Sequence, residues 1–249
     1  MRAILRWVGL LVIAAVALQV FFIVRIALAA TMDPQSTTFQ RSEGWRIATQ
    51  RDKLRWRQQW VDYDAISDNL KRAVIASEDG SFTNHDGVDW EAVEKAWQRN
   101  AQAEERAAKQ RPRPAAAAPG RPAARPPKIV GGSTITQQLA KNLLLSGERT
   151  LLRKGQEFIL TFALEKMLSK QRILEIYLNN VEWGEGVFGA EAAARHYYRK
   201  PASQLTAYES ARLAVMLPRP KYFEKLPNSG YLASRAGTIV ARMRGADLP

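Results

Sequence analysis

Four clusters of polar residues lie in order between residues 78 and 179, and their residue types suit acid–base and phosphate chemistry. The clusters are Glu78 to His85, Gly132 to Gln138, Arg153 to Glu157 and Ile173 to Asn179. They place carboxylates, amides and cations at the ends or along the faces of short predicted helices, where a role in the core alone would favour apolar residues. An active site is the economical interpretation.

Glu78 is the candidate general base, because a carboxylate can take a proton from a sugar hydroxyl as that oxygen attacks. The structural alternative is a solvated acid at the end of a helix. Phe82 and His85 follow in the same short segment and serve no simple amphipathic purpose, which favours the functional interpretation. Asp79 would tune or orient Glu78.

The second cluster begins as a helix start, in which Ser133 or Thr134 would be the cap. Capping does not require the two adjacent glutamines that follow, Gln137 and Gln138. Amides at the N-terminus of a helix favour an anionic ligand, so we expect contact with a phosphate or a sugar. The chain lacks the nucleotide P-loop pattern.

Four cations come next in the chain: Lys141, Arg149, Arg153 and Lys154. They could form a solvated basic helix face, and Glu157 could simply pair with Arg153 four residues earlier. Together with the preceding glutamines, they indicate a diphosphate site in which Glu157 holds Mg²⁺ or Mn²⁺, because such hard cations prefer oxygen ligands.

The fourth cluster carries Glu175, Tyr177 and Asn179 between apolar residues of one predicted helix. Here the structural interpretation is the stronger one, and these side chains would buttress the cleft. The two histidines, His85 and His196, are too far apart in sequence to give a zinc-ligand spacing.

Helical spacing of apolar residues predicts a mainly α fold, with no strands beyond a short hairpin. The expected helices cover residues 65–76 after the cap Asp64, 90–97 after Asp89, 135–144 after Ser133 or Thr134, 151–168, 170–179 after Ser169, and 207–216 after Thr206. Gly80 would end the first helix, so that Glu78 and Asp79 emerge at its terminus or just beyond, where side chains can converge on a cleft.

Composition allows one domain with accessory segments in these 249 residues, and the absence of cysteine excludes disulfides and thiolate chemistry. The net charge of +13 is unevenly spread: residues 99–128 hold eight Lys/Arg and two Glu, which supplies 8 − 2 = +6 of it. The remainder is mildly basic, which suits a protein that handles phosphates at an anionic membrane better than one that binds nucleic acid.

Residues 101–127 consist largely of Ala, Pro, Arg and Gln, which predicts a disordered insertion. Residues 101–109 could instead continue the preceding helix until Pro112 stops it. We expect the basic residues of this insertion to add a weak attraction to an anionic membrane and to be dispensable for the chemical step.

The N-terminal region predicts a transmembrane anchor over residues 7–30, which are apolar apart from Gln19 and Arg25. A cytoplasmic tail, residues 1–6, would precede it, and a polar, irregular linker, residues 31–57, would follow. A cleaved signal peptide is the alternative, because an Ala-Leu-Ala sequence resembles a processing site.

In their order and spacing the clusters closely resemble the motifs of the peptidoglycan glycosyltransferases, glycosyltransferase family 51, and specifically the monofunctional biosynthetic transglycosylases. The resemblance runs from about Asn69 to Pro220. Its motifs are Glu78 to Gly87, Gly132 to Gln138, Arg153 to Glu157, Arg172 to Asn179 and Gly186 to Tyr198.

The resemblance implies a lysozyme-like glycosyltransferase domain over residues 58–249. This domain would polymerise lipid II into glycan strands and release undecaprenyl diphosphate at the outer face of the inner (cytoplasmic) membrane, for cell wall biogenesis. Its partners would be lipid II, the growing strand, membrane lipids and other cell-wall synthesis or division proteins, without nucleic acid. No penicillin-binding transpeptidase domain is expected, because Ser-x-x-Lys and Lys-Thr-Gly do not occur.

The resemblance also assigns roles to single residues. Glu78 would activate the 4-hydroxyl of the acceptor, with Asp79 and Glu157 as the other catalytic candidates. The donor diphosphate would be engaged by Glu157, Lys141, Arg149 and Arg153, and the donor side lined by Ser133, Thr134, Gln137 and Gln138.

Two other functions compete with this one. A lytic hydrolase could use carboxylates in a similar helical fold, but it needs neither a diphosphate site nor a membrane anchor. A noncatalytic membrane adaptor would explain the anchor and the basic insertion, and it would leave the four polar clusters without a purpose.

Overall fold

Most of the chain is helical, because apolar residues recur at helical spacing behind polar caps. The computed structural model describes residues 1–50, 55–109, 132–145, 147–148 and 150–249. Their helices are α1 (Arg2–Ala29), α2 (Thr38–Gln50), α3 (Asp68–Glu78), α4 (Trp90–Lys109), α5 (Ile135–Leu144), α6 (Leu151–Met167), α7 (Lys170–Asn180), α8 (Ala190–Tyr198), α9 (Ala207–Met216), α10 (Pro220–Phe223) and α11 (Gly230–Arg242). The mainly α prediction is confirmed.

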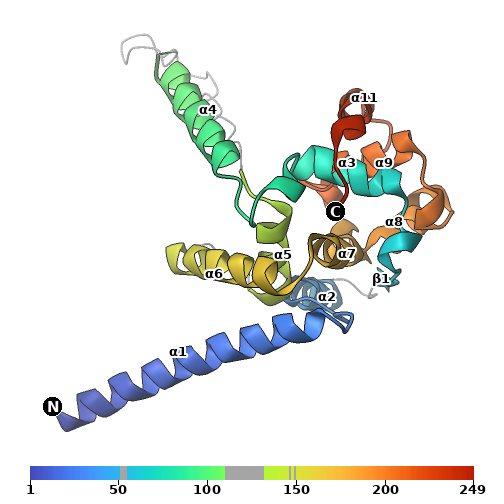
Figure 1. Ribbon diagram of the computed structural model, residues 1–249. Coiled ribbons are helices and arrows are strands. Elements are labelled where there is room, and N and C mark those ends of the chain that lie inside the picture. Colours follow the sequence, from blue (N-terminus) through green and yellow to red (C-terminus); the bar gives the residue numbers. More distant parts are fainter. Residues whose placement is uncertain (51–54, 110–131, 146, 149) are drawn as a thin grey trace.

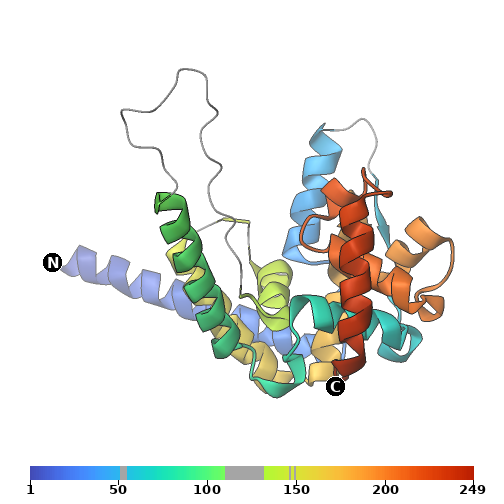
Figure 2. The same cartoon turned by 90° about the horizontal axis from the view of Figure 1, so that it is seen from above.

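Two packed groups of helices form the body around one hydrophobic core (Figure 1). In the first group α3 packs against α9 and α11, and in the second α5 packs against α2, α6 and α7. The short 3-10 helices η1 (Tyr63–Ala65), η2 (Phe82–Asn84), η4 (Ala202–Gln204) and η5 (Met243–Gly245) connect the longer elements. In both views α1 and α4 project from this body (Figure 1 and Figure 2).

The predicted hairpin is present and gains a third strand. Strands β2 (Glu182–Gly184) and β3 (Val187–Phe188) pair antiparallel, and β1 (Arg57–Gln58) pairs parallel with β3. Gly186 in the hairpin turn has a φ of 72°, and a Cβ there would lie 2.0 Å from the Arg55 carbonyl oxygen. Only glycine therefore allows β1 to approach the hairpin this closely.

The predicted caps of four helices are confirmed. Thr134 and Thr206 each form a capping box, and Ser169 accepts a hydrogen bond from the Arg172 backbone N–H at 3.1 Å. Asp89 accepts one from the backbone N–H of Ala92 at 2.7 Å. These contacts satisfy backbone donors that a helix start would leave unpaired.

The predicted cap Asp64 and helix start at residue 65 are wrong. Asp64 lies in η1, and the chain is extended at Ile66, so the long helix starts only at Asp68. Ser67 is the cap, and its side chain accepts from the Asn69 backbone N–H at 3.2 Å.

The prediction of an irregular segment over residues 31–57 is also wrong, because α2 occupies its middle. Thr37 and Gln40 cap α2 reciprocally, with backbone to side-chain distances of 2.8 and 3.0 Å. Gln40 and Ile47 are buried, and the Gln40 amide donates to the Asn180 carbonyl oxygen at 3.2 Å. Because only two residues of α2 are buried and one of them is polar, the helix gives little apolar periodicity in the sequence.

The prediction of disorder is wrong for residues 101–109, because helix α4 continues to Lys109, as the helical alternative for this stretch predicts. Its Ala, Gln, Glu, Arg and Lys residues are good helix formers, and Lys109 pairs with Glu105 four residues earlier. The rest of the predicted insertion, residues 110–127, lies outside the described residues.

Helix α1 is long and apolar enough to cross a membrane. Its most apolar stretch of 18 residues has a mean hydropathy of 2.6, and only 6% of that stretch is buried. It runs beside α6 (Figure 1). Helix α6 exposes the apolar side chains of Leu151, Leu152, Ile159 and Phe162. The C-terminal end of α1 is docked on the body, because Phe22, Ile26 and Ala29 are buried there. The guanidinium of Arg172 donates to the carbonyl oxygens of Ala29 and Met32 at 2.9 and 3.0 Å.

One polar contact joins the apolar faces of α1 and α6. The side-chain amides of Gln19 and Gln156 hydrogen-bond to each other in both directions, at 2.7 and 2.9 Å. Each amide therefore supplies both a donor and an acceptor to the other between two largely apolar helix faces.

We expect this amide pair to couple α1 to the body. In a double-mutant cycle of Gln19→Leu and Gln156→Leu, the free energy of unfolding in detergent should show a coupling of about 0.6 to 1.7 kcal/mol between the two positions. The matched control replaces Gln19 and Gln98, because Gln98 bonds within α4 and is exposed. Strictly additive losses for Gln19 and Gln156 would contradict the contact.

Candidate active site

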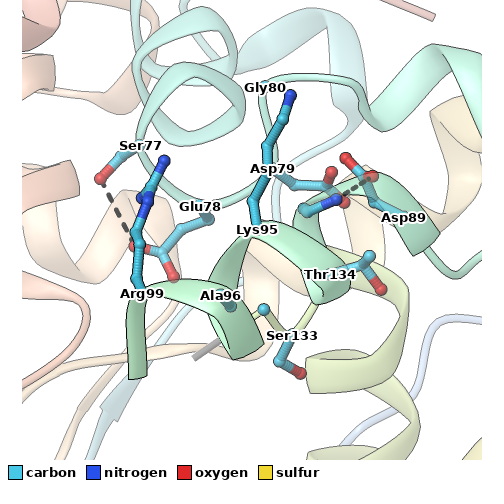
Figure 3. A pocket seen from close by; sticks show the side chains of 12 residues that line it. Ser77, Glu78, Asp79, Gly80, Asp89, Lys95, Ala96, Arg99, Ser133 and Thr134 are labelled. Atoms are coloured by element: carbon cyan, nitrogen blue, oxygen red, sulfur yellow. Dashed lines mark hydrogen bonds between the residues drawn. The ribbon is translucent and has the colours of Figure 1, made fainter. Parts of the chain in front are cut away.

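Glu78 ends α3 and lines a cavity of about 220 Å³ (Figure 3). The Gln138 amide Nε2 donates to Glu78 Oε2 at 3.0 Å, and the Ser77 hydroxyl donates to Oε1 at 3.4 Å. Burial raises the pKa of the Glu78 carboxyl, while these two hydrogen bonds and the more distant Lys141 charge oppose part of that rise. The net shift brings this carboxylate nearer to the strength that a general base needs at neutral pH.

Gln138 is itself held by Tyr177. The hydroxyl of Tyr177 donates to Gln138 Oε1 at 3.0 Å, so the other end of the amide, which can only donate, must face Glu78. Tyr177 is buried, and burial raises the pKa of its hydroxyl well above the ordinary value, which keeps it a neutral donor. The predicted buttressing role of Tyr177 is confirmed.

Asp79 holds the segments around Glu78 together. One carboxylate oxygen is 2.8 Å from His85 Nε2, and the other accepts from the backbone N–H of Ile135 at 3.0 Å. The charge of Asp79 also contributes to the raised pKa of Glu78. Because both oxygens are engaged, Asp79 acts on the site as a positioning residue, in line with the predicted tuning and orienting role.

The second cluster divides between the cavity and the helix cap. Ser133 is exposed at the rim, and Thr134 lines the same cavity (Figure 3). Thr134 and Gln137 cap α5 reciprocally, with the Thr134 hydroxyl donating to the Gly87 carbonyl oxygen at 2.6 Å. Gln137 is buried in this cap and does not line either of the two cavities of the site, whereas Gln138 faces Glu78.

A second cavity, of about 350 Å³, contains the predicted cations Lys141 and Arg153. Gln138 also lines this cation cavity, and its amide donates to Glu78, which lines the first cavity. This one side chain therefore links the two cavities. Lys154 does not line either cavity and pairs with Glu157. Arg149 lies outside the described residues.

Glu157 is buried and pairs with Arg153 and Lys154. One oxygen bonds Arg153 Nη1 at 3.0 Å and the other bonds Lys154 Nζ. Among the described residues no group of three or more His, Cys, Asp or Glu side chains could hold a metal ion. A metal held by the protein alone therefore does not fit this cluster, because both oxygens of its one carboxylate already bond cations.

Three residues of the site escaped the sequence analysis. Lys95 and Arg99 of α4 line the cavity of Glu78 (Figure 3), and Glu182 of β2 lines the cation cavity. The spacing of four between Lys95 and Arg99 places them on one helix face, but so does any solvated basic pair. Glu182 carries no local signal, because β2 packs against α10, which is distant in sequence.

Comparison with known proteins places the chain in a family. It matches the Transglycosylase family over residues 45–109 and 121–244. It is 48% identical over 252 residues to the biosynthetic peptidoglycan transglycosylase of Burkholderia thailandensis, covering 100% of this chain and 90% of that protein. The protein of the same name in Paraburkholderia phytofirmans is 50% identical over 249 residues, covering 98% and 94%. The chain belongs to the transglycosylase family, whose domain is lysozyme-like, as predicted.

The raised pKa of Glu78 implies that ionising this residue destabilises the fold. When an acid has a higher pKa in the folded protein than its ordinary 4.5, the protein loses stability as the pH rises through the folded-state pKa. We therefore expect Glu78→Gln to be more stable than wild type at pH 8, with a difference that shrinks towards zero below pH 4.5. Thermal unfolding of both proteins across this pH range measures it, and a Glu78→Gln protein that is less stable at pH 8 would contradict the assignment.

Proposed function

We propose that this chain is a peptidoglycan glycosyltransferase that polymerises lipid II into glycan strands and releases undecaprenyl diphosphate. One observation supports it most: a buried carboxylate with a raised pKa is joined through Gln138 to a cavity that carries Lys141 and Arg153. A base beside a cation-lined cavity suits transfer from a sugar diphosphate. The names of the relatives describe the same reaction class.

The proposed reaction follows from the charges. The 4-hydroxyl oxygen of the acceptor attacks C1 of the donor sugar, and Glu78 takes the hydroxyl proton. The bond from C1 to the diphosphate oxygen breaks, and the diphosphate leaves with the electron pair. Lys141 and Arg153 meet the negative charge that grows on this leaving group, so they stabilise the transition state more than the ground state.

Arg153 depends on Glu157 for its position in this scheme. The buried Glu157 carboxylate fixes Arg153 and Lys154 in one geometry, which lowers the cost of ordering them when the diphosphate binds. We therefore assign Glu157 to positioning of the cations. Dependence on Mg²⁺ or Mn²⁺ stays a prediction.

The competing hydrolase function lacks support of this kind. A hydrolase of finished glycan meets no diphosphate, and the cation cavity would then have no ligand. A noncatalytic adaptor would have no use for the buried, raised-pKa carboxylate of Glu78, which costs stability.

The chain carries an N-terminal helix compatible with a single-pass membrane anchor. We place this helix in the bacterial inner membrane, with the catalytic domain on the periplasmic side where lipid II presents its sugars. The docked end of α1 supports an uncleaved anchor over a signal peptide, because Arg172 bonds the carbonyl oxygen of Ala29, the last residue of α1, and that of Met32 just beyond it. The exposed apolar side chains of α6 beside α1 would then face lipid. Interaction with other cell-wall synthesis or division proteins stays a prediction.

Glu78→Gln should abolish polymerisation, because the amide keeps the volume of the side chain and cannot accept the proton. We expect a loss of at least about 10²- to 10⁴-fold in turnover of labelled lipid II, with product identified by lysozyme digestion. Glu94→Gln on the exposed face of α4 is the matched control and should retain activity. Turnover at the wild-type rate by a folded Glu78→Gln protein would exclude the assignment.

Glu157→Gln should lower turnover by about tenfold, because it loosens two charge-assisted contacts that order Arg153 and Lys154. A titration with Mg²⁺ or Mn²⁺ distinguishes the possible causes. If Glu157 orders the cations, the metal concentration for half-maximal activity stays the same in the variant. A shift in that concentration would make Glu157 a metal ligand instead.

A further inference from the structure

The proposed mechanism leaves one buried carboxylate in the cation cavity without a role. Glu182 on β2 is only 6% exposed and lines this cavity together with Lys141 and Arg153. Its Oε1 receives no hydrogen bond from any of the described residues. Lys221 Nζ lies 3.4 Å from that oxygen, an ion-pair contact that is longer than an ordinary hydrogen bond.

Lys221 cannot fully compensate Glu182, because it is shared. The ammonium group of Lys221 bonds Glu43 of α2 more closely, and Glu43 also pairs with Arg46 at 2.8 Å. Burial raises the pKa of Glu182 to about 7, against the attraction of Lys221. A buried carboxylate with an unmet acceptor costs free energy, and one that borders a cavity is a candidate for binding a ligand that supplies the missing donor.

The charged groups of the cavity come from different elements, which indicates what Glu182 could bind. Lys141 and Arg153 come from α5 and α6, which pack together and are joined by a segment with the exposed Glu148. The buried Glu182 comes from β2, which packs against α10. A carboxylate repels phosphate and accepts hydrogen bonds from hydroxyl and amide N–H groups. A ligand that carries a diphosphate next to a sugar with hydroxyl and N-acetyl groups matches both the cations and Glu182.

We propose that Glu182 is a substrate-binding residue, whose Oε1 accepts a hydrogen bond from a hydroxyl or amide N–H of the sugar attached to the diphosphate held by Lys141 and Arg153. This proposal rests on the proposed function and adds a determinant for the sugar part of the substrate. Glu182 would make no contact with the diphosphate itself.

A purely structural role for Glu182 makes a different prediction. If Glu182 only anchors Lys221 and α2, its loss should disturb the whole cavity, and ligands with and without a sugar should weaken together. A sugar contact weakens only the ligand that carries the sugar.

The experiment measures equilibrium binding to the full chain in detergent, in a Glu78→Gln background that prevents turnover. The two probes are lipid II and undecaprenyl diphosphate, which share the lipid and the diphosphate and differ in the disaccharide. Glu182→Gln and Glu182→Ala are compared with Glu185→Gln, a carboxylate in the same hairpin that does not line the cation cavity. Glutamine keeps the volume at position 182 and removes the buried charge, so this variant should fold.

We expect both Glu182 variants to weaken lipid II binding by about tenfold or more, the loss typical for a hydrogen bond to a charged group. Binding of undecaprenyl diphosphate should stay within about twofold, since the cations are retained. Glu185→Gln should leave both affinities unchanged. An equal loss for both probes, or no loss for lipid II, overturns the proposal. If the Glu78→Gln parent binds neither probe, the proposed function itself fails, and the role of Glu182 with it.

Discussion

Asp79 uses both carboxylate oxygens to hold three segments together, and the geometry of the site depends on this contact. It follows the last residue of α3, and it bonds the first backbone N–H of α5 and the imidazole of His85. The start of α5 is thereby fixed against the end of α3. One turn into α5, Gln138 then reaches Glu78, and Tyr177 from α7 fixes the orientation of the amide. A buried carboxylate suits this task because its two oxygens form strong hydrogen bonds with two groups at once. An apolar residue at position 79 would leave the Ile135 N–H and the His85 ring without this partner.

The site concentrates polar groups that oppose stability. Burial raises the pKa of Glu78 and of Glu182, so both acids are held in surroundings that disfavour their charge. The surrounding structure offsets this with a core that includes Trp183, Tyr177 and Phe82 at less than 2% exposure. It also caps the start of α5 reciprocally and pairs both oxygens of the buried Glu157 with cations. Both acids border the two cavities, where a substrate could relieve this cost.

Local signals predicted much of this fold and part of the site. Thr134 as the cap of α5 and Glu78 at the end of α3 follow from residue spacing alone, because caps and helix periods act over a few residues. The same local view assigned Gln137 to substrate, although it completes the capping box, and it missed α2, whose two buried residues dock on distant helices. Lys95 and Glu182 reach the cavities through tertiary packing, which no spacing in the sequence encodes.

The pH dependence of kcat/KM for lipid II polymerisation tests the role of Glu78 most directly, because it reports the essential base of the free enzyme. Gln138 stabilises the ionised form of Glu78 by a hydrogen bond, so Gln138→Ala should raise the pKa of this carboxylate further. We predict that the acid limb of the wild-type profile lies above the ordinary glutamate value of 4.5 and moves to higher pH in Gln138→Ala. An acid limb at or below 4.5, or one that the substitution leaves in place, would contradict Glu78 as the base.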